Sequence, residues 1–126
     1  MKKLFLLAIP VFLLVLSACG GGKGYTDISV SELQTMLENK DFLFVNTHIP
    51  FEGDIPNTDL SIPYNQINQY LDQLPSDKNA KIVLYCRSGN MSTQAAEELV
   101  SLGYTNVYEL DGGFNAWKAA GLPMDN

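Results

Sequence analysis

Residues 82–92 read Ile-Val-Leu-Tyr-Cys-Arg-Ser-Gly-Asn-Met-Ser, an apolar run followed by a polar segment that contains glycine. The apolar run, residues 82–85, is typical of a strand buried in a parallel sheet. The polar segment, residues 86–91, predicts a tight loop, and Ser92 opens a predicted helix with one apolar face. Cys86 therefore lies between the end of a strand and the start of a helix, where parallel sheets hold their ligands.

The sequence on either side alternates strand-like and helix-like segments in the same rhythm. Ser29 and Glu32 form a capping box, which predicts a helix that ends near Asn39. Gly103 is a C-terminal stop for the helix that Ser92 opens. Further strands are expected at residues 42–45, 60–63 and 107–110, a loop at 46–59, and helices at 65–74 and 114–120. This alternation, without internal repeats, predicts one α/β domain with a mostly parallel sheet.

The position of Cys86 predicts a reactive thiol. The thiolate is the nucleophilic form, and a helix N-terminus presents N–H groups and the positive end of the helix dipole, which lower the pKa of a cysteine. Arg87 adds a positive charge beside the sulfur, and Gly89 allows the backbone to curl around it. Such a loop suits a thiolate, and equally a persulfide with its anionic terminal sulfur. The alternative interpretation is a buried structural cysteine, which is common in proteins.

Residues 86–92 resemble the active-site loop of the rhodanese family. The similarity continues on both sides of the loop, in the strand 82–85, in Ala95, Ala96, Leu99, Leu102, Gly103, Tyr104 and Val107, and in the segment 110–117. It extends over about residues 27–123 and is more specific in the second half of the chain than in the first. The resemblance implies a rhodanese-like α/β fold, in which helices flank a mostly parallel central sheet on both faces.

The same resemblance implies a thiosulfate:acceptor sulfurtransferase that works without a cofactor or metal. Cys86 would attack a small sulfane sulfur donor such as thiosulfate, carry the sulfur as a persulfide, and pass it to a thiophilic acceptor such as cyanide. Backbone N–H groups of residues 87–91 would hold the charged sulfur. Arg87 and Ser88 would also meet an anionic donor at the rim of the loop. The implied substrate-binding residues are Arg87, Ser88, Gly89, Asn90, Met91 and Ser92.

The first half of the chain departs from the rhodanese pattern. Asn46 stands where the family usually has an aspartate, and His48 where it often has an arginine. Residues 48–63 replace a short acidic helix and a His-Ile-Pro-Gly-Ala run, of which Asp54-Ile55-Pro56 is a degenerate counterpart. His48, the one histidine of the chain, is interpreted either as a proton-transfer or donor-binding group or as a loop residue with a local hydrogen bond.

The same residues bear on other possible activities of the fold. Phosphatases that share this fold place an arginine after the cysteine and five further residues, but here that position is Ser92. Tyr85 replaces the histidine that precedes their cysteine, so phosphoryl transfer lacks its charge stabilisation. Thiol–disulfide exchange usually needs a nearby second cysteine, which the sequence around Cys86 lacks. A non-catalytic binding or sulfide-sensing module stays open because the first half is altered, although Cys86 is retained.

The first 24 residues differ in character from the rest of the chain. Lys2 and Lys3 precede an apolar run from Leu4 to Ala18, which is shorter than the ~20 residues that span a bilayer as a helix. A basic start, a short apolar run and then small residues are typical of a secretory signal. A membrane helix or a buried core helix is the alternative.

Residues 16–19, Leu-Ser-Ala-Cys, resemble the lipobox of bacterial lipoproteins, in which the cysteine is lipidated and becomes the first residue of the mature chain. The resemblance implies a signal peptide at residues 1–18, a lipidated Cys19 with a Gly-rich flexible tether at 19–24, and a rhodanese-like domain at 25–126. It further implies an extracytoplasmic protein anchored to a bacterial membrane, on the periplasmic or the outer cell face. An ordinary signal peptide with an incidental cysteine is the alternative.

Charge and cysteine content narrow the expected partners. The chain has 14 acidic and 8 basic residues, and cleavage that removes Lys2 and Lys3 makes its charge of −6 more negative still. Such a surface argues against nucleic acid as a partner. It also argues against electrostatic membrane binding, so contact with the bilayer is expected through the lipid on Cys19. Once Cys19 is lipidated, Cys86 has no partner for an internal disulfide, because the chain has 2 cysteines.

Overall fold

The computed structural model describes residues 22–126, so the predicted signal peptide and Cys19 lie outside the described residues. Within this range, no helix combines the length and the apolar character needed to cross a membrane. The described strands form a sheet in the order β1-β5-β4-β2-β3, and each pair of neighbours is parallel, as predicted. The strand bounds are β1 Tyr25–Ile28, β2 Leu43–Asn46, β3 Leu60–Ser61, β4 Ile82–Tyr85 and β5 Val107–Leu110.

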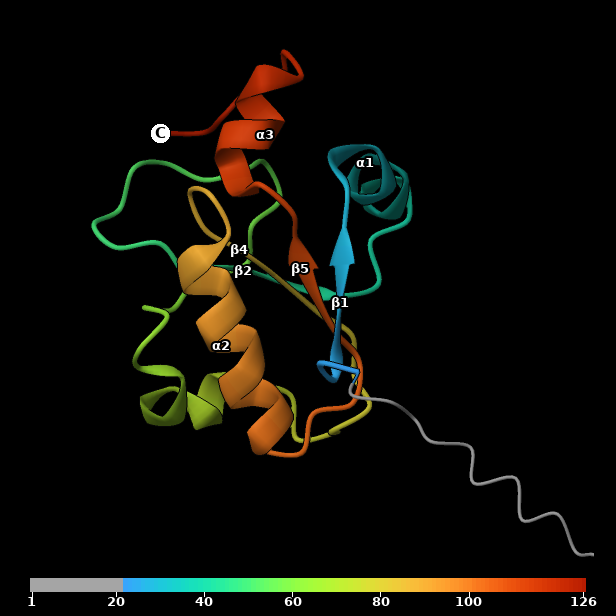
Figure 1. Ribbon diagram of the computed structural model, residues 1–126, viewed down its shortest axis with the longest axis vertical. Helices are drawn as coiled ribbons and strands as arrows, with labels where there is room; N and C mark the ends of the chain where they lie inside the picture. Colours follow the sequence, from blue (N-terminus) through green and yellow to red (C-terminus); the bar gives the residue numbers. More distant parts are fainter. Residues whose placement is uncertain (1–21) are drawn as a thin grey trace, which may run out of the picture.

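Helices cover both faces of the sheet, which confirms the predicted architecture (Figure 1). On one face pack α1 (Val30–Glu38) and α3 (Gly113–Ala119). On the other face packs α2 (Asn90–Ser101), together with the 3-10 turn η1 (Ile67–Gln69). A second 3-10 turn, η2 (Leu71–Gln73), follows η1 along the chain.

The strands divide their side chains between two apolar cores, because successive residues of a strand point to opposite faces. In β4, Val83 and Tyr85 join the core beneath α1 and α3, whereas Ile82 and Leu84 join the core beneath α2. All four are fully buried. Since burial of a large apolar side chain stabilises a fold by about 1.5–3 kcal/mol, this central strand is held firmly from both sides.

The parallel arrangement places the carboxyl ends of all strands at the same edge of the sheet. β4 ends at Tyr85, directly before Cys86, and β5 ends at Leu110, shortly before α3. β2 ends at Asn46 and leads into the long loop that returns to β3. The loop after β4 therefore lies between the loops that follow its two neighbours in the sheet.

The capping box at the start of α1 is confirmed. The Glu32 N–H donates to Ser29 Oγ over 3.1 Å, and the Ser29 N–H donates to Glu32 Oε1 over 3.4 Å. A cap of this kind stabilises a helix by typically ~1 kcal/mol.

The helix predicted at residues 65–74 is wrong. The segment makes two separate 3-10 turns with hydrogen bonds three residues apart, such as the Gln69 N–H to the Gln66 carbonyl and the Gln73 N–H to the Tyr70 carbonyl, both over 2.9 Å. Of the residues within η1 and η2, only Ile67 is buried. The apolar residues Ile67, Tyr70, Leu71 and Leu74 have helical spacing, so the sequence pattern did not distinguish two 3-10 turns from one helix.

Candidate active site

The loop after β4 turns sharply at Gly89. This residue has a φ of 113°, in the left-handed region that favours glycine. The helix α2 then begins at Asn90, two residues before Ser92, where the sequence pattern had placed its start. The early start brings Ser92 into the first turn of α2, with its side chain fully buried beneath the loop.

The sulfur of Cys86 has two hydrogen-bond donors within reach. The Gly89 N–H donates to Sγ over 3.0 Å, and Ser92 Oγ lies 3.3 Å from Sγ as a second donor. Gly89 is the N-cap residue of α2, so the positive end of the helix dipole faces the sulfur. Within the described residues, no other amide of the loop bonds to Sγ, so the predicted cradle of amides is reduced to one N–H and one hydroxyl.

The first turn of α3 fixes the opposite side of the loop. The Phe114 N–H donates to the Cys86 carbonyl over 2.8 Å, and the Asn115 N–H donates to the Arg87 carbonyl over 2.9 Å. Gly113 makes this approach possible, because a Cβ at its position would lie 2.3 Å from the Cys86 carbonyl oxygen. These two hydrogen bonds fix the loop in the conformation in which the Gly89 N–H donates to the sulfur.

The other predicted substrate-binding residues differ in their exposure to solvent. Arg87, Ser88 and Asn90 are exposed, and Met91 is half-buried. Within residues 22–126, the Arg87 guanidinium takes part in no ion pair, which leaves its charge available to an anion in solvent. Cys86 itself is only 1% exposed.

Glu109 is a buried residue of the site that the sequence analysis missed. It lies on β5, is 3% exposed, and its Oε1 accepts a hydrogen bond from Ser92 Oγ over 2.6 Å. Burial raises the pKa of Glu109 to about 7; the Ser92 hydrogen bond opposes this rise, and the carboxyls of Asp27 and Asp111 add to it. The signal in the sequence was a lone acid inside a strand expected to be buried.

Asn46, which replaces the usual aspartate of the family, organises the loop after β2. Its Nδ2 donates to the Gly53 carbonyl over 3.1 Å and to Asp54 Oδ1 over 3.0 Å, and its Oδ1 accepts from the His48 N–H over 3.0 Å. An aspartate has no donor for the first two bonds and would face the Asp54 carboxylate. Asparagine in place of the usual aspartate at position 46 therefore suits the presence of the Asp54 carboxylate beside it.

Tyr85 connects β4 to the same loop. Its hydroxyl accepts from the Ile55 N–H over 3.0 Å, lies 2.7 Å from Thr58 Oγ1 and donates to Asp54 Oδ1 over 3.2 Å. Burial raises the pKa of Tyr85 well above its ordinary value, so the phenol stays neutral. Tyr85, which stands where the phosphatases have a histidine, therefore anchors the loop after β2.

His48 packs against α3. Its side chain is 8% exposed, and its ring meets the Phe114 ring edge-to-face at 5.4 Å between centroids. Nε2 lies 2.8 Å from Glu52 Oε2, and neither ring nitrogen makes a hydrogen bond among the described residues. His48 therefore lies beside Glu52, but its side chain does not make the local hydrogen bond that the loop-residue interpretation assumed.

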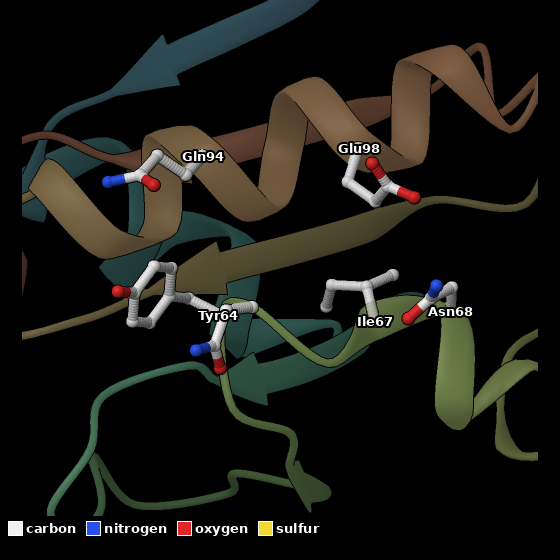
Figure 2. A pocket seen from close by; sticks show the side chains of 6 residues that line it. Tyr64, Ile67, Asn68, Gln94 and Glu98 are labelled. Atoms are coloured by element: carbon white, nitrogen blue, oxygen red, sulfur yellow. The ribbon is translucent and has the colours of Figure 1, made fainter.

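Two surface hollows lie apart from the sulfur. One, of about 240 Å³, lies between the segment around η1 and α2, and the residues that line it include Tyr64, Asn68, Gln94 and Glu98 (Figure 2). The other, of about 380 Å³, lies between β1, β5 and α1. Neither is lined by a residue of the segment 86–92, so the sulfur is held within its loop and outside both hollows.

The chain is similar in sequence and in fold to known proteins. Residues 29–120 match the family described as rhodanese-like domain. The chain is 37% identical over 99 residues to a sulfurtransferase of Allochromatium vinosum, a match that covers 76% of this chain and 90% of that protein. It is 30% identical over 103 residues to the thiosulfate sulfurtransferase GlpE of Vibrio cholerae, with 80% and 95% covered.

A solved structure supports the likeness in fold. The crystal structure of a rhodanese-like domain protein from Staphylococcus aureus gives a TM-score of 0.66 at 30% identity. The superposition covers 80% of this chain and 99% of that one. The fold expected from the residues around Cys86 is confirmed by this superposition and by the parallel sheet with helices on both faces.

Proposed function

Because the chain belongs to the rhodanese-like family, we propose that it transfers sulfane sulfur from a small donor to a thiophilic acceptor through a persulfide on Cys86. The observation that carries the proposal is the sulfur itself. It lies between a central strand and the N-terminus of α2, and it accepts hydrogen bonds from the Gly89 N–H and from Ser92 Oγ. These donors favour an anionic sulfur over a neutral one.

With thiosulfate as the donor and cyanide as the acceptor, the reaction divides into two displacements. The Cys86 thiolate attacks the outer sulfur of thiosulfate, the sulfur–sulfur bond of the donor breaks, and sulfite leaves with the bonding electron pair. The product is a persulfide anion on Cys86. Cyanide then attacks the terminal sulfur, thiocyanate leaves, and the thiolate is restored. Each half-reaction conserves charge and needs no added proton.

The loop contributes electrostatic stabilisation to both half-reactions. The amide of Gly89 and the dipole of α2 are fixed before the donor arrives, so no reorganisation is needed as negative charge moves between sulfur atoms. The exposed guanidinium of Arg87 is available to attract a dianionic donor to the loop. Thiosulfate fits this arrangement because it is small and doubly charged.

Replacement of the nucleophile tests the proposal. We expect the wild-type protein to form thiocyanate from thiosulfate and cyanide, and Cys86→Ser to lose this activity while it keeps the circular dichroism spectrum of the fold. Ser101→Ala, which removes an exposed hydroxyl at the far end of α2, serves as the control and should stay active. Activity in Cys86→Ser, or inactivity of the wild type under the same conditions, contradicts the proposal; the second result favours a binding module.

We also propose that the domain is held at a bacterial membrane by lipid on Cys19. The support is the resemblance of residues 16–19 to a lipobox and the glycines that follow. Labelled palmitate added to expressing bacteria should enter the wild-type protein and place it in the membrane fraction. Cys19→Ser should lose both the label and the membrane association. Incorporation of the label into Cys19→Ser would contradict lipidation at this residue.

A further inference from the structure

Glu109 is a buried carboxyl with no basic ion-pair partner in the part of the chain that the structure describes. Within the described residues it forms no ion pair with a lysine, arginine or histidine, although it is 3% exposed. Burial of an ionised carboxylate without a positive partner is costly, so burial favours the protonated, neutral form of the carboxyl group. The proposed sulfur transfer makes no use of this carboxyl.

The Ser92 hydroxyl connects Glu109 to the sulfur. This hydroxyl has one proton and three acceptors within reach: Glu109 Oε1 at 2.6 Å, the Gly89 carbonyl at 3.2 Å and Cys86 Sγ at 3.3 Å. A carboxylate is the strongest acceptor of the three when it is ionised. A neutral carboxylic acid can itself donate to Ser92 Oγ, which frees the hydroxyl proton for the sulfur.

We propose that Glu109 is a positioning residue for the sulfur chemistry, neutral when Cys86 carries an anionic sulfur and ionised when Cys86 is a neutral thiol. In the first state Ser92 donates its proton to the sulfur, and in the second state Ser92 donates it to Glu109. This inference rests on the proposed function only in that it takes Cys86 as the residue that carries the anion.

The exchange between the two states balances within the site. The thiol proton passes to Ser92 Oγ while the hydroxyl proton of Ser92 passes to the Glu109 carboxylate. A thiolate and a neutral carboxylic acid result, and the site has neither gained nor lost a proton. The buried thiol thus has an internal acceptor for its proton, although it is only 1% exposed to solvent.

The charges around Glu109 favour its neutral form when an anion is nearby. Asp27, its register partner on β1, and Asp111, just beyond β5, are both acidic. Lys23 pairs with Asp27, and the Arg87 guanidinium is exposed on the other side of the loop. A second negative charge on Cys86, one hydroxyl away, repels an ionised Glu109 further. The pKa of Glu109, raised by burial to about 7, puts the exchange in the neutral range.

The pH dependence of Cys86 alkylation tests the coupling without any sulfur donor. Rates of reaction with iodoacetamide are measured for the wild type, for Glu109→Gln, and for Glu97→Gln as a control on the exposed face of α2. At acid pH Glu109 is protonated, so wild type and Glu109→Gln should coincide. At weakly alkaline pH the ionised Glu109 suppresses the wild-type thiolate, so Glu109→Gln should react severalfold faster. Glu97→Gln should follow the wild type throughout.

Two results of the alkylation experiment would overturn the inference. One is a profile of Glu109→Gln that matches the wild type at every pH. The other is a change of rate by the same factor at every pH, which indicates altered access to the sulfur without electrostatic coupling. Neither result bears on sulfur transfer itself, which the thiocyanate assay with Cys86→Ser measures separately.

A second measurement covers the case in which Glu109→Gln does not fold. The wild-type protein is labelled with ¹³C at the glutamate carboxyls, and the Glu109 resonance is followed through a pH titration before and after loading with thiosulfate. A persulfide anion on Cys86 should move the Glu109 midpoint to higher pH, and Cys86→Ser treated in the same way should show no movement. An unchanged midpoint in a wild-type sample whose mass confirms the persulfide would overturn the inference.

Discussion

At the scale of single residues, the anion site depends on the Gly89 amide and the Ser92 hydroxyl, the two groups that donate to the sulfur. The amide belongs to the backbone and cannot be removed by substitution, whereas the hydroxyl can. The Ser92 hydroxyl also lies within hydrogen-bond distance of the buried Glu109 carboxyl. Its substitution therefore affects both the sulfur and the carboxyl behind it.

Ser92→Ala should slow sulfur transfer. A hydrogen bond to a charged group contributes about 1.5–3 kcal/mol, so a loss of about tenfold or more in kcat is expected in the thiocyanate assay. Ser101→Ala is the matched control, because it removes an exposed hydroxyl that donates to the Glu98 carbonyl in the same helix. Equal rates for Ser92→Ala and Ser101→Ala would show that the hydroxyl does not support the anion.

Glu109 should also make stability depend on pH. Burial raises its folded pKa to about 7 from an ordinary value of 4.5, so between these values the folded chain keeps a proton that the unfolded chain has released. Stability from this group is therefore present at acid pH and is lost as pH rises toward 7. Urea unfolding should give a free energy that falls across this window in the wild type and falls less in Glu109→Gln. Parallel curves would contradict the raised pKa.

The sequence predicted some of these residues and not others, for a physical reason. Cys86, Gly89 and Ser92 are near neighbours in the chain, and their chemistry follows from a local strand-to-helix turn. Glu109 is distant in sequence and becomes part of the site only because β5 lies beside β4. Its burial arises from long-range packing that a local pattern does not record.

At the scale of elements, the first turn of α3 packs directly onto the loop that carries Cys86. The two carbonyl groups at Cys86 and Arg87 are held by the first amides of α3, and this contact leaves no room for a side chain at Gly113. The Gly112-Gly113 turn was predicted from the sequence, but its role as the surface on which the loop rests was not.

Gly113→Ala should therefore separate α3 from the loop. The new Cβ would meet the Cys86 carbonyl oxygen at 2.3 Å, and the residue has a φ of 57°. We expect a loss of more than ~1 kcal/mol in the free energy of unfolding, together with loss of sulfur transfer. The control is Gly103→Ala, where φ is 95° but no atom lies within 4 Å of the added carbon. If both variants keep the same activity, the contact is not required.

Elements differed in how well the sequence predicted them. The buried strands β4 and β5 and the helices α1 and α2 were predicted because their apolar patterns are continuous and their ends are marked. β1 has the sequence Tyr-Thr-Asp-Ile and burial only at Ile28, so its pairing with β5 defines it better than its composition does. The segment 65–74 has apolar residues at helical spacing, and Ile67 and Leu74 are buried, but the backbone forms two short 3-10 turns in place of a helix.

At the scale of the whole molecule, the parallel sheet sets the position of the site. Because β4 lies between β2 and β5, the loop with Cys86 is flanked by the segment after Asn46 and by the turn before α3. This general arrangement followed from the alternating elements. The path of residues 48–63 could not be predicted from this alternation. It depends on hydrogen bonds of Asn46 and Tyr85 to backbone and side-chain groups 7 to 31 residues away.

The most direct test of persulfide chemistry on Cys86 is the intact mass of the protein after treatment with thiosulfate, followed by peptide mapping. The wild-type protein should gain the mass of one sulfur atom, located on Cys86, and should lose it again when cyanide is added. Cys86→Ser should gain nothing. A wild-type protein that shows no added sulfur, or that forms only mixed disulfides at Cys86, would contradict the account.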